Sequence, residues 1–118
     1  MSDKKTLQIM NQFDAAFQTH DPSLLEGLLA EDCVLENSGP APGGSRHVGR
    51  AACQEFWSGI AANTDANFET EEIWTADDRA VIRWRLRWGP TEAESVRGVN
   101  LMKVRDGLIV EGMGYVKG

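Results

Sequence analysis

Residues 80–88 read AVIRWRLRW, and this stretch decides the fold because apolar and basic side chains alternate along it without interruption. Neighbouring side chains of an extended strand point to opposite faces of its sheet. The core-facing side chains are therefore predicted to be Ile82, Trp84, Leu86 and Trp88. The three arginines between them are predicted to coat the outer face. The pattern predicts a strand that is buried on one side and charged on the other.

Further strands are predicted on either side of this one. Residues 67–75 alternate in the same manner, and two longer strands follow at residues 93–105 and 108–117. Asp106-Gly107 between them is a strong signal for a two-residue hairpin turn. Because hairpin-linked strands pair with their neighbours, the second half of the chain predicts an antiparallel sheet, and residues 33–37 are predicted to be a short additional strand.

The first half of the chain predicts helices, because its apolar residues recur every three or four positions. The three stripes are Leu7, Met10, Phe13 and Phe17, then Leu24, Leu25, Leu28 and Leu29, then Cys53, Phe56, Trp57 and Ile60. Asp21-Pro22 is typical of the N-cap and first position of a helix, here the short second one. Residues 38–48 are rich in glycine and proline and are predicted to be a loop. The order of elements predicts one α+β domain over residues 1–118, with helices on one face of the sheet.

Length and charge narrow the classes of function. A chain of 118 residues is one domain's worth of sequence. Its net charge of −6 disfavours nucleic acid and anionic membranes, whose phosphates would be repelled. No apolar run predicts a signal peptide or a membrane-spanning helix. The two cysteines, Cys33 and Cys53, match no metal or redox spacing, so we expect reduced core thiols in a cytoplasmic protein without a metal or cofactor.

Three phrases of the sequence, taken in order, carry a family resemblance. They are LLAEDCVLEN at residues 28–37, VGR followed by FW at 48–50 and 56–57, and RGVN followed by VRDGLI at 97–100 and 104–109. Together they resemble the SnoaL-like, ketosteroid-isomerase-like branch of the nuclear transport factor 2-like superfamily. The resemblance implies a strongly curved antiparallel sheet wrapped as a cone around three N-terminal helices, with an internal apolar pocket. It also implies a homodimer formed through the outer sheet face.

The resemblance also assigns positions to the proton chemistry of the bacterial ketosteroid isomerases. Those enzymes use an aspartate base, and a tyrosine and a protonated aspartate that hold the developing enolate oxygen. The base falls on Asn37, the tyrosine on Phe13 and the second aspartate on Asn100. Because an amide does not titrate near neutral pH and phenylalanine has no donor, isomerase activity is not expected from these positions.

The same positions are suited to binding, since the expected pocket is mostly apolar with Asn37 and Asn100 as its polar groups. The other walls are predicted to be Phe13, Phe17, Phe56, Trp57, Ile82, Trp84, Leu86 and Met102. His47 is predicted near the mouth. We therefore expect a small, mostly apolar ligand. The alternatives are a cyclase, dehydratase or isomerase that uses another acid or base such as His47, and a filled core in which the asparagines bond to each other or to the backbone.

The outward arginines of residues 83–87 are expected to pair with acidic side chains on neighbouring strands. The candidates are Glu69, Glu71 and Glu111. Basic side chains interleaved with aromatic ones also occur on nucleic-acid-binding surfaces, but strand alternation accounts for this run without a nucleic-acid partner.

Overall fold

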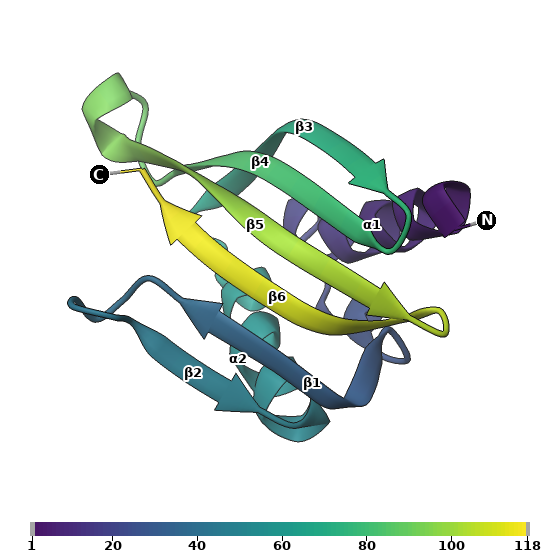
Figure 1. Cartoon of the computed structure of the whole chain (residues 1–118). Coiled ribbons are helices and arrows are strands. Elements are labelled where there is room, and N and C mark those ends of the chain that lie inside the picture. The colour runs from purple at the N-terminus through teal and green to yellow at the C-terminus, as the bar shows by residue number, and fades with distance from the viewer. Residues whose placement is uncertain (1, 118) are drawn as a thin grey trace.

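The structure, a computed structural model, describes residues 2–117 and contains two α-helices and one sheet (Figure 1). The helices are α1 (Ser2–Gln18) and α2 (Arg50–Ala62). The strands are β1 (Leu29–Asn37), β2 (Ser45–Val48), β3 (Asn67–Ala76), β4 (Arg79–Arg87), β5 (Ser95–Arg105) and β6 (Leu108–Val116). Both helices lie on the same side of the curved sheet. Residues 1 and 118, which the predicted domain includes, lie outside the described residues.

The second half of the chain forms the predicted antiparallel meander. β3 pairs with β4, β4 with β5 and β5 with β6, in a sheet of order β2-β1-β6-β5-β4-β3. Ala80 and Ile82 are buried on the inner face, as the alternation of β4 predicts. The prediction for Trp88 is wrong, because β4 ends at Arg87 and the Trp88 side chain is 51% exposed. Strand parity therefore holds only as far as the strand itself extends.

The predicted second helix is wrong beyond its first turn. Only Pro22–Leu25 are helical, as a 3₁₀ turn, and the Asp21 side chain caps it by accepting a hydrogen bond from the Ser23 amide. Gly27 then takes a positive φ of 80°, a conformation that a helix cannot continue through. The chain enters β1 at Leu29, so residues 2–117 contain two α-helices where three were predicted.

Two further predictions are wrong: part of the predicted loop is a strand, and the sheet is mixed rather than purely antiparallel. Residues 45–48 lie in the predicted loop but form β2, an edge strand that pairs antiparallel with β1. β1 in turn pairs in parallel with β6, with Leu35 opposite Gly112. Hairpin turns in the sequence indicate pairing only between consecutive strands. They could not indicate the pairing of β1 with β6, because these two strands are separated by most of the chain.

The core lies between the two helices and the inner face of the sheet. From α1 it receives Ile9, Met10, Phe13 and Phe17, which are all buried. Leu7, predicted in the same stripe, is 39% exposed because the buried arc of the helix is centred on the other four residues. Within residues 2–117, neither helix has the length and apolar content needed to cross a membrane.

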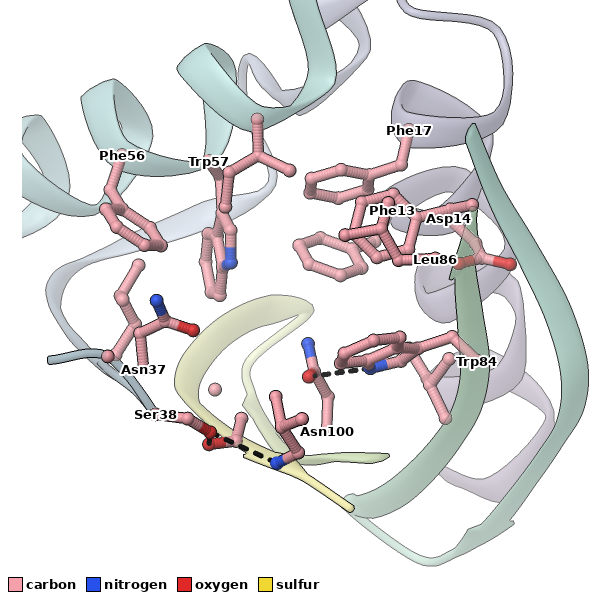
Figure 2. A pocket seen from close by; sticks show the side chains of 18 of the residues that line it. Phe13, Asp14, Phe17, Asn37, Ser38, Phe56, Trp57, Trp84, Leu86 and Asn100 are labelled. Atoms are coloured by element: carbon pink, nitrogen blue, oxygen red, sulfur yellow. Dashed lines mark hydrogen bonds between the residues drawn. The ribbon is translucent and has the colours of Figure 1, made fainter. Parts of the chain in front are cut away.

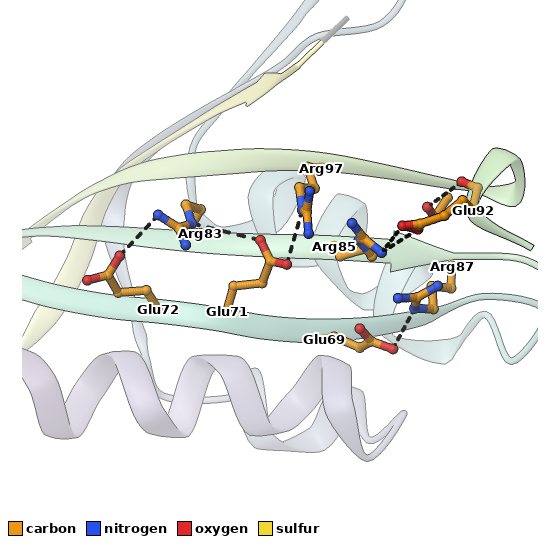
Figure 3. A network of polar contacts seen from close by, with 9 residues as sticks. Glu69, Glu71, Glu72, Arg83, Arg85, Arg87, Glu92 and Arg97 are labelled. Carbon is orange, nitrogen blue, oxygen red and sulfur yellow. Dashed lines mark hydrogen bonds and ion pairs between the residues drawn. The ribbon is translucent and has the colours of Figure 1, made fainter.

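The outer face of the sheet carries the predicted ion pairs (Figure 3). The pairs with the predicted partners are Arg87 with Glu69, Arg83 and Arg97 with Glu71, and Arg79 with Glu111. Arg85 differs from the prediction, because it is only 7% exposed and does not coat the surface. A 3₁₀ turn at Glu92–Glu94 brings Glu92 onto the Arg85 guanidinium, with one nitrogen 2.8 and 3.1 Å from the two carboxylate oxygens.

Candidate functional site

A cavity of about 350 Å³ lies between α1, α2 and the inner face of the sheet (Figure 2). Its lining includes Phe13, Phe17, Asn37, Phe56, Trp57, Ile82, Trp84, Leu86 and Asn100 from the predicted set. Met102, also predicted, does not line it, since it is fully buried one inward position farther along β5. The lining is largely aromatic and aliphatic, so an occupant would lose most of its contact with water.

Aromatic side chains brace one side of the cavity. The Phe13 ring lies 4.9 Å from both Phe17 and Trp57, and its contact with Trp57 is edge to face. Phe68 continues the cluster, with its ring 5.7 Å from Phe17 and 5.3 Å from Trp84. Tilted and edge-to-face contacts at these separations are favourable and hold each ring against rotation. The cavity therefore has walls of defined shape.

Three glycines on the inner face of the sheet make room for these rings and for the cavity. A Cβ on Gly98 would stand 2.5 Å from the Trp84 ring, and one on Gly112 would stand 2.6 Å from the Trp57 ring. Gly114 lies beside the side chains of both asparagines. None of these glycines is among the predicted site residues. The available signal is their position, since all three fall at inward-facing places on two adjacent strands, β5 and β6.

The two asparagines lie in this cavity with different degrees of restraint. The Trp84 indole nitrogen donates to the Asn100 amide oxygen at 3.1 Å. The Asn37 side chain has no hydrogen-bond partner among residues 2–117, Asn100 included. The backbone of Asn37 is nevertheless held, because the next side chain, Ser38, donates to Gly114 O at 3.2 Å. The asparagines thus remain open to the cavity instead of bonding to each other.

Two acidic residues that line the cavity are missing from the predicted set. One is Glu36, which forms an ion pair with Arg46 of β2, and the other is Asp14. Its carboxylate accepts hydrogen bonds from the Thr70 hydroxyl and, at 3.4 Å, from the Gln18 amide. Burial raises the pKa of the Asp14 carboxyl above its usual value, and the Thr70 hydrogen bond acts in the opposite direction. The available signal is a single acidic residue between Phe13 and Phe17 on the helix face that meets the sheet.

His47 and the two cysteines do not line the cavity. His47 is on β2 and does not line it, although its ring packs 4.5 Å from the Phe56 ring, which does. Cys33 and Cys53 are buried free thiols, and the Cys53 thiol donates to the Cys33 carbonyl at 3.3 Å. Burial raises the pKa of Cys33 to about 12. In the part of the chain that the structure describes, no three His, Cys, Asp or Glu side chains are grouped as metal ligands would be.

Comparison with known proteins places the chain among proteins of the same fold. No curated protein matches it. An NTF2-like protein of unknown function from Mesorhizobium loti is 53% identical, with 98% of this chain and 93% of that one covered and a TM-score of 0.90. A candidate ketosteroid isomerase from Kribbella flavida is 20% identical, with 98% of this chain and 80% of that one covered and a TM-score of 0.82.

An LEH-like epoxide hydrolase of M. tuberculosis is 21% identical over 98% of this chain and 80% of that one, with a TM-score of 0.73. At this identity the last two similarities concern the fold alone. The model of the SnoaL-like domain family matches residues 10–112, which is most of the chain. The curved sheet, the two helices against its inner face and this match agree, and the chain belongs to the SnoaL-like domain family.

Proposed function

We propose that the protein binds a small, mostly apolar molecule carrying one carbonyl or hydroxyl group. The observation that carries this proposal is the pair of asparagines, whose amide groups are open to a mostly apolar cavity of about 350 Å³. Small-molecule sites commonly combine such a volume with a few fixed polar groups. Asn37 and Asn100 are both half-buried, so a ligand that displaces water from their amides must hydrogen-bond to them to avoid leaving polar groups unpaired.

Binding is tested with a variant that fills the space between the two amides. The side chain introduced by Gly114→Val begins about 3.3 Å from the Asn100 amide oxygen and projects from the inner face of β6. We expect titration with a panel of small ketones and alcohols to shift the Asn37 and Asn100 side-chain amide resonances of the wild type, and to leave those of the variant in place. Binding that survives unchanged in Gly114→Val would place the ligand elsewhere.

The proposal includes the absence of ketosteroid isomerase activity. Phe13, Asn37 and Asn100 supply neither a base nor an acidic donor, and in those enzymes the base itself carries the proton. The test is an assay with a β,γ-unsaturated ketosteroid on the wild type and on the triple variant Phe13→Tyr, Asn37→Asp, Asn100→Asp. We expect turnover only in the triple variant, and efficient turnover by the wild type would contradict the proposal.

A second candidate function is catalysis, and Asp14 is the observation that favours it. A carboxyl at the wall of an apolar cavity, with its pKa raised by burial, is the kind of group that enzymes use to move protons. It replaces His47 as the acid or base to test, because His47 does not line the cavity. If the cavity transforms its ligand, Asp14→Asn should abolish turnover and preserve binding. An unchanged rate would exclude Asp14 from the reaction.

We also propose a homodimer formed through the outer face of the sheet. An apolar row crosses four strands there, with Trp74 opposite Val81, Val81 opposite Leu101, and Leu101 opposite Met113. Trp74 is 54% and Leu101 42% exposed, and ion pairs flank the row. A self-complementary patch of this kind suits a two-fold interface.

A cytoplasmic location is proposed from the two reduced, buried thiols.

A further inference from the structure

We infer that Trp84 is a positioning residue that fixes Asn100 as a hydrogen-bond donor, so that the cavity prefers a ligand with an acceptor atom over a ligand that can only donate. The inference rests on the proposed binding function and specifies the chemistry of the ligand at that same site. It is carried by one hydrogen bond, from the Trp84 indole nitrogen to the Asn100 amide oxygen at 3.1 Å.

The orientation of the Asn100 amide follows from the chemistry of its partner. An indole N–H can donate and cannot accept, so the atom that faces it must be the amide oxygen. The NH₂ group of Asn100 therefore points the other way, and Figure 2 shows it on the cavity side. Among residues 2–117 that NH₂ group has no acceptor, which leaves both of its hydrogens for a ligand.

Trp84 is itself held in place on two sides. Its ring packs on Gly98 of the neighbouring strand, where a Cβ would come within 2.5 Å. The ring also makes an edge-to-face contact with Phe68. To turn the Asn100 amide over, the indole hydrogen bond must be broken and an N–H left facing an NH₂. Because the ring cannot withdraw without losing these contacts, the donor character of Asn100 is built into the sheet.

Asn37 is not restrained in this way, and this difference defines the ligand class. Its amide has no partner among the described residues, so it can turn to present either its oxygen or its nitrogen. A carbonyl oxygen can accept from both asparagines, and a hydroxyl can accept from Asn100 while donating to Asn37. A ligand whose only polar group is a neutral ring N–H leaves the Asn100 donor unsatisfied. The predicted ligand is therefore an apolar ketone, ester or alcohol.

The experiment compares three bicyclic probes of nearly the same shape: 1-indanone, which only accepts, indole, which only donates, and indane, which does neither. For the wild type we expect 1-indanone to bind about three- to tenfold more tightly than indane, as one hydrogen bond allows. Indole, which can donate only to Asn37, should bind less tightly than 1-indanone, because it leaves the Asn100 NH₂ group unsatisfied. The Asn100 side-chain NH₂ resonances should shift with 1-indanone and not with indane.

Two variants separate the role of the donor from that of its orientation. Asn100→Leu removes the amide, and the preference for 1-indanone over indane should then shrink to what Asn37 alone supplies. Trp84→Phe keeps the ring on Gly98 but removes the indole N–H, so the Asn100 amide can turn and accept from indole. The preference for 1-indanone over indole should shrink several-fold in Trp84→Phe, whose fold is checked by its melting temperature and amide spectrum.

The outcomes distinguish this inference from the proposed function. If none of the three probes binds the wild type at millimolar concentration, the proposed function fails, and the inference fails with it. If all three bind with equal affinity, the cavity binds ligands but the inference about Asn100 is wrong. An unchanged preference in a folded Trp84→Phe variant overturns the role of Trp84. If that variant does not fold, the order of affinities in the wild type decides the question by itself.

Discussion

Gly98 lies directly opposite Trp84 across β4 and β5, and the Trp84 ring occupies the space where a side chain of residue 98 would stand. A methyl group at this position would also come within 2.6 Å of the Tyr115 carbonyl oxygen, which belongs to the backbone and cannot rotate away. We predict that Gly98→Ala lowers the free energy of unfolding by about 1–3 kcal/mol, the usual range for overpacking. Denaturant titration measures this change.

Gly59 provides the matched control for that substitution. It lies in α2, and a Cβ there would meet no atom within 4 Å. Gly59→Ala should therefore stabilise the protein by about 0.5–1 kcal/mol, as alanine does in place of glycine within a helix. Equal effects of the two substitutions would mean that Trp84 does not pack on Gly98 in solution.

Leu101 is the test residue for the proposed dimer, because it lies within the apolar row on the outer sheet face. We predict that Leu101→Glu places a charge in the interface and converts the dimer to a 13.0 kDa monomer, as measured by light scattering. Leu7→Glu is the control, since Leu7 is similarly exposed but lies on α1. A wild type that has the mass of one chain at micromolar concentration and low salt would refute the interface.

Asp14 should make the stability of the protein fall as the pH rises. Burial raises the pKa of its carboxyl in the folded state, so the folded protein holds that proton more tightly than the unfolded chain does. Asp14 therefore destabilises the fold as the pH rises from its ordinary pKa of 3.8 through the raised value. We predict that Asp14→Asn is the more stable protein at pH 7, by no more than about 1 kcal/mol. Below pH 3.8 the difference should vanish.

Asp32 should show the opposite dependence and serves as the control for this measurement. The hydrogen bond from Arg105 lowers the pKa of the Asp32 carboxyl, so its contribution is present above pH 3.8 and is lost as the pH falls through the lowered value. Asp32→Asn should therefore be the less stable protein at pH 7. The test is the melting temperature of the wild type and of both variants between pH 3 and 7. The difference between variant and wild type should rise with pH for Asp14→Asn and fall with pH for Asp32→Asn, and a change in the same direction for both would contradict the two pKa shifts.

The two thiols should be unreactive in the folded protein. Cys33 and Cys53 are both fully buried, and burial raises the pKa of Cys33 to about 12, so the thiolate is scarce at pH 8. We predict that a disulfide reagent labels neither cysteine in the native state at pH 8 within the time in which both react in denaturant. Rapid labelling without denaturant would show that the core between β1 and α2 opens.

The meander from β3 to β6 is predictable because its evidence is local. Alternation at Ile82 and Trp84 leaves one face for the core, and a turn follows each strand, so register and neighbours are both specified. Leu28-Leu29 illustrates the limit of such evidence, since a short apolar run fits a buried strand as well as a helix. The parallel pairing of β1 with β6 leaves no local mark at all, because its partners are far apart in the chain.

The same distinction applies to the cavity. Inward strand parity and the family resemblance predict Asn37, Asn100 and the aromatic walls. Both kinds of evidence lie in the sequence around each residue. Asp14 could not be found in this way, because its partner Thr70 is 56 positions away and only the fold brings them together. The glycines contribute by lacking a side chain, and only the folded structure reveals which side chain fills that space.

The parallel pairing of β1 with β6 also ties the cavity to the order of protein synthesis. β1 leaves the ribosome before α2 and the meander, whereas β6 is made after the other five strands. Until β6 arrives, the edge of β1 that will receive it has unpaired backbone groups and can add to another nascent chain. Ser38 has no Gly114 to hold it during that time. A chain stalled before β6 should therefore carry both helices but be unable to bind the ligand, and its open β1 edge is where chaperones would be needed.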